Sequence, residues 1–255
     1  MAPSLFLAHG SPMLAIEQTE YTDFLAKLAG QWKPKAIVVF TAHWETEILT
    51  ISSTDEVYET IYDFGGFPEE LYKVRYPAKG SVEIAAMLEE RFRERGIDAR
   101  TDAVRGLDHG TWTLLYRMYP QADIPVIQVS VNPYLPLEQQ YRIGEALRGL
   151  GDEEVLIIGS GVTVHNLRAL RWGQTTPEGW AAEFDDWIIR QIQANDLASL
   201  VRAMELAPHA RMAVPRAEHF VPLYIVFGSG NPQSAAEVIH RSYDHGSLSY
   251  LCFQF

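Results

Sequence analysis

The sequence contains one cysteine, Cys252, among 255 residues. A lone thiol excludes an internal disulfide and fits a reducing compartment, so we expect a cytoplasmic protein. Cys252 lies in an apolar run, where a thiol is expected to be inert. Histidine and carboxylate therefore remain as the strong ligands for a transition metal, and the chain has eight histidines.

Long apolar runs are also missing. The strongest ones, residues 36–40 and 155–158, are far shorter than the roughly 18 residues that a membrane crossing needs. The N-terminal segment lacks the basic region and the longer apolar stretch of a signal peptide. No membrane partner is expected.

Positive charge is scarce. Lys and Arg number 21 against 33 Asp and Glu, which gives a formal net charge of −12, and no basic run provides a local exception. This balance argues against binding to the phosphate backbone of a nucleic acid. Hydrophobic residues at 47% and charged residues at 21% are typical of a globular protein. Without a linker or a repeat, we expect one domain over residues 1–255.

Several catalytic motifs are absent as well. The chain has no Gly-rich dinucleotide or phosphate loop, no Gly-x-Ser-x-Gly and no His-Glu-x-x-His. The short Gly159-Ser160-Gly161 is too common to indicate a nucleophile or a phosphate site on its own.

Hydrophobic patterning predicts alternating strands and helices, hence a single-domain α/β fold with a mostly parallel central sheet flanked by helices. Buried apolar runs, some rich in β-branched residues, indicate strands, whereas apolar residues at helical spacing indicate helices. The expected strands are residues 4–8, 36–40, 48–52, 124–131, 155–158 and 250–255. The expected helices are residues 21–29, 82–95, 137–150 and 178–193.

Three histidines follow predicted strands. His9 comes directly after residues 4–8, His43 after residues 36–40, and His165 a few residues after 155–158. Ligands of open α/β sheets bind outside the carboxyl ends of the strands, so these imidazoles can converge there. Convergent neutral imidazoles suggest a zinc or iron site, although a single histidine after a strand more often only hydrogen-bonds within its loop.

Two further histidines lie beside acidic residues. His109 follows Asp108, which either orients a catalytic imidazole or stabilises a turn. His219 follows Glu218, so the pair supplies either a ligand with its supporting carboxylate or a surface helix N-terminus. The remaining histidines have no distinctive setting and are expected on the surface or in packing: His209, His240 and His245.

Taken in order, these motifs resemble the class III extradiol ring-cleavage dioxygenases, in particular their 4,5-DOPA dioxygenase-like branch. The resemblance spans nearly the whole chain. It rests on His9-Gly10-Ser11-Pro12, Ala42-His43-Trp44-Glu45, Tyr62-Asp63-Phe64-Gly65-Gly66-Phe67-Pro68, Tyr76-Pro77-Ala78, Gly106-Leu107-Asp108-His109-Gly110-Thr111-Trp112, Gly159-Ser160-Gly161, His165-Asn166-Leu167 and Glu218-His219.

The resemblance implies an oxygen-dependent cleavage of a catechol ring at a mononuclear non-haem metal. His9, His43 and His219 are then the metal ligands, with Fe(2+) required for activity and Zn(2+) as a possible occupant. His165 is the acid/base residue or a fourth ligand, and His109 is catalytic through contact with the substrate or O2. Many extradiol enzymes use two histidines and a carboxylate, whereas here the third ligand is His219 and Glu218 is its neighbour.

Other interpretations remain open. Phe64, Phe67 and Tyr72 either pack on the substrate ring or belong to the core. Three cationic side chains could bind a substrate carboxylate, although we expect each of them to be solvated at the surface: Lys73, Arg75 and Arg105. The substrate and the oligomeric state are left undetermined.

Two alternative functions compete with ring cleavage. A zinc-dependent hydrolase would use metal-bound water with Glu45 or Glu218 as the base. A non-catalytic metal-binding homologue would keep the pocket without the chemistry.

Overall fold

Apolar side chains on both faces of the central strands organise the fold, which the computed structural model describes for residues 2–255. In β2 (Ala36–Glu45), Val38 and Phe40 belong to one buried cluster, whereas Ile37 and Val39 belong to another. Alternate residues of a strand point to opposite faces, so a strand that is apolar throughout must be covered on both sides.

Within residues 2–255, eight strands form one sheet in the order β4-β3-β5-β2-β6-β1-β10-β7. Besides β2, these strands are β1 (Ser4–Ala8), β3 (Leu49–Ser52), β4 (Ala99–Asp102), β5 (Val126–Val131), β6 (Val155–Gly161), β7 (Glu237–His240) and β10 (Cys252–Gln254). A separate hairpin consists of β8 (Tyr243–Asp244) and β9 (Leu248–Ser249).

The four central strands, β5, β2, β6 and β1, run parallel, which confirms the predicted sheet type. β10 pairs antiparallel with β1 and with β7, and β3 pairs antiparallel with β5. Because β1, β2 and β6 are neighbours and parallel, their carboxyl ends lie at one edge of the sheet. This edge carries the histidines described below.

Helices cover both faces of the sheet. They are α1 (Glu20–Ala29), α2 (Val82–Glu94), α3 (His109–Met118), α4 (Leu137–Glu145), α5 (Gly179–Gln193), α6 (Leu197–Leu200), α7 (Ala203–Leu206), α8 (Ala210–Ala213) and α9 (Val221–Ser229). Short 3-10 helices are η1 (Pro12–Ala15), η2 (Leu71–Lys73), η3 (Leu150–Glu153) and η4 (Leu167–Ala169).

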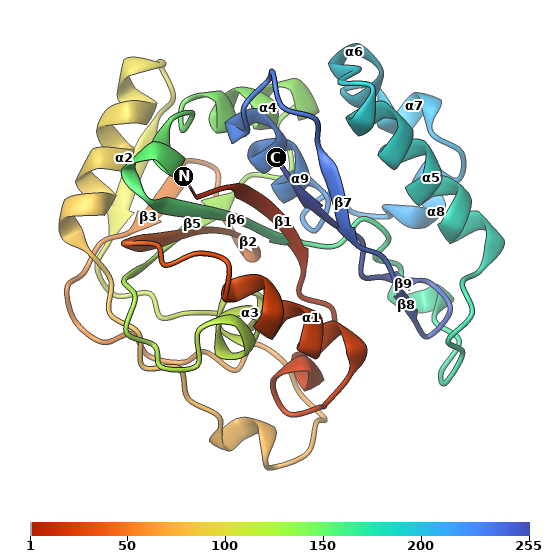
Figure 1. Cartoon of the computed structure of the whole chain (residues 1–255), viewed down its shortest axis with the longest axis horizontal. Helices are drawn as coiled ribbons and strands as arrows, with labels where there is room; N and C mark the ends of the chain where they lie inside the picture. The colour runs from red at the N-terminus through yellow and green to blue at the C-terminus, as the bar shows by residue number, and fades with distance from the viewer. Residues whose placement is uncertain (1) are drawn as a thin grey trace.

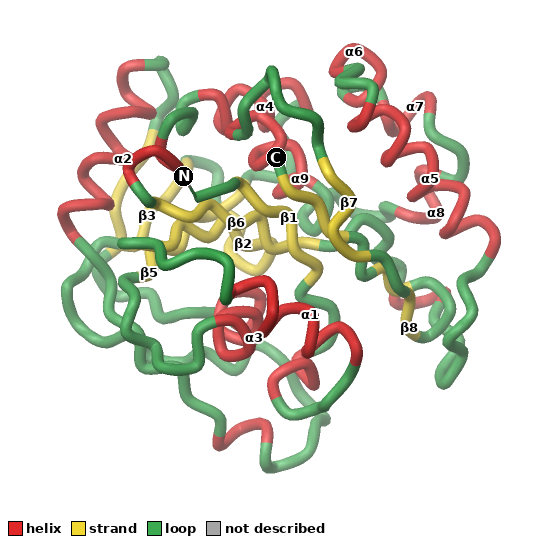
Figure 2. The backbone as a smooth tube through the Cα atoms, viewed as in Figure 1, coloured by secondary structure: helices red, strands yellow, loops and turns green. Residues whose placement is uncertain are grey.

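Figures 1 and 2 show α2, α4 and α9 on one side of the strands and α1 and α3 on the other. Helices α5 to α8 stand beside β7 at one flank of this layered arrangement. No helix within residues 2–255 has both the length and the apolar character that a membrane crossing needs.

Helix α9 has no polar face, because every residue from Val221 to Ser229 is buried. It packs so closely on α4 that a Cβ added at Gly144 would lie 1.9 Å from the carbonyl oxygen of Ile225. A Cβ at Gly228 would lie 2.0 Å from the carbonyl oxygen of Tyr141. Two glycines thus let the backbones of α4 and α9 approach each other, which places α9 against the sheet.

Each predicted strand and helix is present, although several boundaries differ and other elements were not predicted, among them β4, β7 and α9. β2 continues through His43 to Glu45, so this histidine lies inside the strand and not after it. The helix predicted over residues 137–150 ends at Glu145. Helix α9 was not predicted, because an all-apolar segment has no amphipathic pattern.

Candidate metal centre

His9 follows β1 and lies at the carboxyl end of the sheet. Its backbone N–H donates to the carbonyl oxygen of Gly161, the last residue of β6, at 3.3 Å. The side chain is fully buried, and its Nδ1–H donates to Ser160 Oγ at 2.9 Å. Ser160 can accept this proton because its own hydroxyl donates to the carbonyl oxygen of Gly110.

His43 reaches the same edge from within β2. The register between β2 and β5 shifts between Phe40 and Glu45. Such an irregularity changes the direction in which side chains point, which in a regular strand alternates between the two faces of the sheet. Arg105 Nη2 donates to the carbonyl oxygen of His43 at 3.1 Å and also binds Asp108 at 3.1 Å, which anchors this end of the strand.

His219 comes from a different element, the turn that precedes α9. Its carbonyl oxygen accepts the backbone N–H of Val162 at 2.8 Å, and a Cβ at Gly161 would lie 2.2 Å from that oxygen. The close approach of β6 therefore fixes the backbone of His219. Its side chain is buried, so the alternative considered from the sequence, in which His219 lies at the surface at a helix N-terminus, is wrong.

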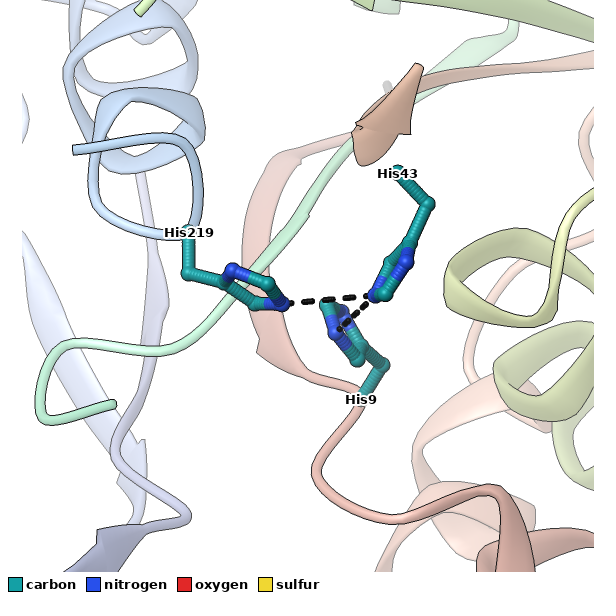
Figure 3. A group of neighbouring side chains, drawn as sticks. All are labelled: His9, His43 and His219. Atoms are coloured by element: carbon teal, nitrogen blue, oxygen red, sulfur yellow. Dashed lines mark hydrogen bonds between the residues drawn. The ribbon is translucent and has the colours of Figure 1, made fainter. Parts of the chain in front are cut away.

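The structure brings these three imidazoles together (Figure 3). The Nε2 atom of His43 lies 3.1 Å from that of His9 and 3.3 Å from that of His219. Figure 3 shows the rings directed toward one another from β1, β2 and the turn before α9.

Hydrogen bonds at the opposite ring nitrogens determine the tautomers. The Nδ1–H groups of His43 and His219 donate to Asp63 Oδ2 at 3.0 Å and to Glu218 Oε1 at 3.1 Å, while that of His9 donates to Ser160. With each proton held at Nδ1, each neutral ring presents an unprotonated Nε2. Three converging lone pairs repel one another unless a cation lies between them, so the donor set fits a metal ion.

Burial keeps the rings of His9 and His219 neutral. It lowers the pKa of His9 and of His219 well below the ordinary histidine value, and the neighbouring imidazoles lower both further. Neutral imidazole is the form that ligates metals, so no proton has to leave at neutral pH.

Asp63 connects this cluster to a fourth histidine. Its Oδ1 accepts both the Nδ1–H of His109, at 2.9 Å, and the backbone N–H of His109, at 3.0 Å, while Oδ2 faces His43. Burial raises the pKa of Asp63, but hydrogen bonds from His109 and His43 outweigh it and hold this pKa well below the usual range. One carboxylate thus orients two imidazoles.

The sequence left two roles open for Asp108, and the one in which it orients the ring of His109 is wrong. Asp108 accepts hydrogen bonds from Thr41 Oγ1 at 2.7 Å and from Arg105. Asp63 was not predicted as a partner of His43 or His109, because nothing in the local sequence links it to them.

His165 lies against His219, with ring centroids 3.7 Å apart and planes inclined by 12°. Its backbone N–H donates to the carbonyl oxygen of Ala213 at 2.9 Å, which holds the loop after β6. Burial lowers the pKa of His165 to about 4, so the ring is neutral near pH 7. A neutral imidazole at this position is able to accept a proton.

A cavity of about 1110 Å³ opens onto these histidines. His43, His109, His165 and His219 line it together with apolar side chains that include Phe64 and Phe67. Its size suits a small aromatic molecule.

Other candidate residues have different surroundings. Tyr72 packs against Tyr62 and Phe64 without lining the cavity, and neither Lys73 nor Arg75 lines it. His245, expected to be unremarkable, lies at the cavity wall. His209 pairs with Glu183, and His240 packs on Tyr21 and Phe24, as expected of surface and packing residues.

The buried histidine cluster lies at the carboxyl ends of parallel strands, where enzymes with open α/β sheets bind their ligands, and it could hold a metal ion. A model of the family described as the catalytic LigB subunit of aromatic ring-opening dioxygenase matches residues 3–252. The chain belongs to this family and is an extradiol ring-cleavage dioxygenase.

Curated relatives and a solved structure agree with this assignment. The chain is 39% identical to a 4,5-DOPA dioxygenase extradiol of Beta vulgaris, over 99% of this chain and 96% of the relative. It is 36% identical to a protein of the same name from Escherichia coli, over 99% and 94% of the two chains. The crystal structure of an uncharacterized Escherichia coli K12 protein, 32% identical, superposes with a TM-score of 0.86 over 100% of both chains.

Replacing Asp63 by Asn is expected to weaken metal binding about 10- to 100-fold. The side-chain amide has one acceptor oxygen, whereas the Nδ1–H groups of His43 and His109 each bind one oxygen of the Asp63 carboxylate. Competition with a chelator followed by metal analysis measures the affinity. Asp98→Asn, a change at an exposed acid outside the site, is the matched control. Unchanged affinity in the Asp63 variant would contradict the positioning role.

Acid is expected to destabilise the metal-free protein below about pH 6.5. Unfolded histidines bind protons there, whereas His9 and His219, whose pKa values are lowered in the folded state, stay neutral to lower pH. The unfolded state then binds more protons, so stability falls with falling pH by up to about 1.4 kcal/mol per pH unit for each histidine.

Urea unfolding between about pH 7.5 and pH 5 measures this slope. The His9→Gln variant should show a shallower slope, and His209→Gln, at an exposed histidine, should not. Equal slopes for the wild type and the His9 variant would contradict the assignment.

Proposed function

We propose that residues 1–255 form one catalytic unit that cleaves the ring of a catechol-type substrate with O2 at a mononuclear non-haem metal. The observation that carries this proposal is the convergence of three imidazoles, each with its proton turned outward, at the buried end of the cavity. The relatives named as 4,5-DOPA dioxygenases support a catechol as the substrate class.

His9, His43 and His219 are the proposed ligands, and a metal held by these three side chains would keep positions for exogenous ligands. When bound, Fe(2+) would activate O2 and lower the pKa of the catechol hydroxyls. Zinc fits the same donor set but has no redox chemistry, so we propose it as an inactive occupant.

The remaining histidines supply proton transfer and orientation. His165 is neutral near pH 7 and lies beside His219, so it can accept a catechol proton and return it later as an acid. His109 donates its Nδ1–H to Asp63, which leaves Nε2 as an acceptor on the cavity wall for a substrate hydroxyl. Phe64 and Phe67 supply apolar surface for the aromatic ring.

The surroundings of the carboxylates disfavour a zinc hydrolase. Glu45 pairs with Arg216, Glu218 receives the Nδ1–H of His219 through one of its two oxygens, and neither residue lines the cavity. Among the described residues that line the buried end, no free carboxylate is available as the base for a metal-bound water.

Anaerobic reconstitution with each metal tests the proposal. The Fe(2+) form should consume O2 with a panel of catechols and produce a yellow ring-opened product, whereas the Zn(2+) form should do neither. An oxygen electrode and absorbance spectroscopy measure both. Equal activity of the two forms would contradict the redox role, and an Fe(2+) form inert toward every catechol would contradict ring cleavage.

Replacing His165 by Ala is expected to reduce turnover at least about 100-fold while most of the metal stays bound, because the change removes a proton carrier but none of the three ligands. Metal content and initial rates are measured on the same preparation. Complete metal loss would instead identify His165 as an essential ligand. His219→Ala is the reference variant in which metal loss is expected.

A further inference from the structure

Helix α5 carries one charged residue on its buried side. Asp185 is fully buried and lies between the apolar side chains of Phe184 and Ile188. Burial raises the pKa of Asp185 above the ordinary aspartate value, although hydrogen bonds from three hydroxyl groups oppose the shift. A buried carboxyl group costs free energy unless its oxygens are satisfied, so the partners of Asp185 indicate what it does.

Both oxygens of Asp185 accept hydrogen bonds from hydroxyl groups, and the two oxygens face different segments. Oδ1 accepts from Thr163 Oγ1 at 2.6 Å, in the loop after β6. Oδ2 accepts from the hydroxyl of Tyr243 at 2.7 Å and from that of Ser249 at 2.6 Å, which belong to β8 and β9. One carboxylate thus joins the loop after β6 to the hairpin.

The loop after β6 carries His165, two residues beyond Thr163. The backbone N–H of His165 donates to the carbonyl oxygen of Ala213 at 2.9 Å, and that of Ser249 donates to the carbonyl oxygen of Val164 at 3.5 Å. Thr163 adds the side-chain bond that reaches the buried face of α5. Together these contacts fix the backbone from which the imidazole of His165 projects.

The ring of His165 has little support of its own. The other histidines of the cluster each donate an Nδ1–H to an acceptor, which is Ser160, Asp63 or Glu218. Within residues 2–255 no such acceptor holds the ring of His165, which stacks on His219 with ring centroids 3.7 Å apart. The position of this ring therefore depends on how its loop is held.

The hairpin side of Asp185 belongs to the wall of the cavity. Two residues of the hairpin and one that follows it line the cavity: Tyr243, Leu248 and Tyr250. Arg241 lies over the ring of Tyr243, but its Nη1 pairs with Asp186 at 2.7 Å, which leaves the oxygens of Asp185 to the hydroxyl groups. Asp185 therefore holds the loop of His165 against the wall beside which a substrate would lie.

We propose that Asp185 is a positioning residue, which acts through Thr163 to hold His165 where it can transfer a proton. The proposal rests on the ring cleavage and on the role of His165 proposed above. A proton carrier works only within hydrogen-bond distance of the reacting group, and a displacement of about 1 Å can cost about 100-fold in rate.

Two variants of Thr163 separate its hydrogen bond from its packing. Thr163→Val removes the hydroxyl and keeps the branched shape, whereas Thr163→Ser keeps the hydroxyl. We expect kcat of the Fe(2+) form with a catechol to fall about 10-fold in the Val variant and less than about 2-fold in the Ser variant. Calorimetric binding of the catechol to the anaerobic Zn(2+) form should change less than about 2-fold in both, because the hairpin keeps its bonds to Asp185.

A second pair of variants tests the carboxylate itself. Asp185→Asn leaves one acceptor oxygen for two segments, so kcat should again fall about 10-fold. The matched control Asp186→Asn changes the next residue, whose side chain is 46% exposed and pairs with Arg241, and it should keep the wild-type kcat. Urea unfolding checks that each variant is folded, and the Thr163 pair decides if the Asp185 variant is not.

Two measurements distinguish positioning from a general effect on the fold. In the His165→Ala background, Thr163→Val should lower the residual rate less than about 2-fold, because the residue through which it acts is gone. In the Zn(2+) form, the ring-proton NMR signals of His165 are identified by their absence from the His165→Ala variant. They should shift in Thr163→Val and Asp185→Asn but not in Thr163→Ser or Asp186→Asn, because stacking on His219 makes them sensitive to the position of the ring.

Each outcome decides one of the two proposals. A wild-type kcat or unshifted His165 signals in Thr163→Val would overturn the positioning role. A full 10-fold loss in the His165→Ala background would also overturn it, because the effect would not pass through His165. Absence of turnover by the wild-type Fe(2+) form with every catechol would overturn ring cleavage, while the NMR signals would still support or refute the control of His165 by Asp185.

Discussion

The tautomers of three histidines are the constraint on which the rest of the site depends. Ser160, Asp63 and Glu218 each accept an Nδ1–H, so each ring must present an unprotonated Nε2 toward the other two. Burial disfavours protonation of His9 and His219, and the resulting cluster of lone pairs is suited to a metal ion. The acceptors are therefore as much a part of the centre as the imidazoles they orient.

This constraint explains features of the fold that appear unrelated to chemistry. Parallel pairing of β1, β6 and β2 delivers His9 and His43 to one edge, and Gly161 lets β6 pass close to the backbone of His219. His219 keeps its position at the carboxyl ends of the strands because α9 is buried against the sheet and packs on α4 through Gly144 and Gly228. A helix without a polar face thus supports the third imidazole.

Asp63 connects His43, a proposed metal ligand, with His109, which is proposed to contact the substrate. It belongs to the long segment between β3 and α2, yet it binds the rings of His43 and His109 at once. One carboxylate therefore contacts both a proposed metal ligand and a proposed substrate contact.

The sequence by itself determined the α/β class, the positions of most strands and the histidines that meet at the sheet edge. These properties depend on local hydrophobic patterns and on the order of motifs, which are readable along the chain. The tertiary structure decided the rest: the partner of His109 is Asp63 and not Asp108, and His43 lies within β2. It also decided which charges line the cavity. Contacts between residues far apart in sequence depend on how the elements pack, and no local pattern encodes that packing.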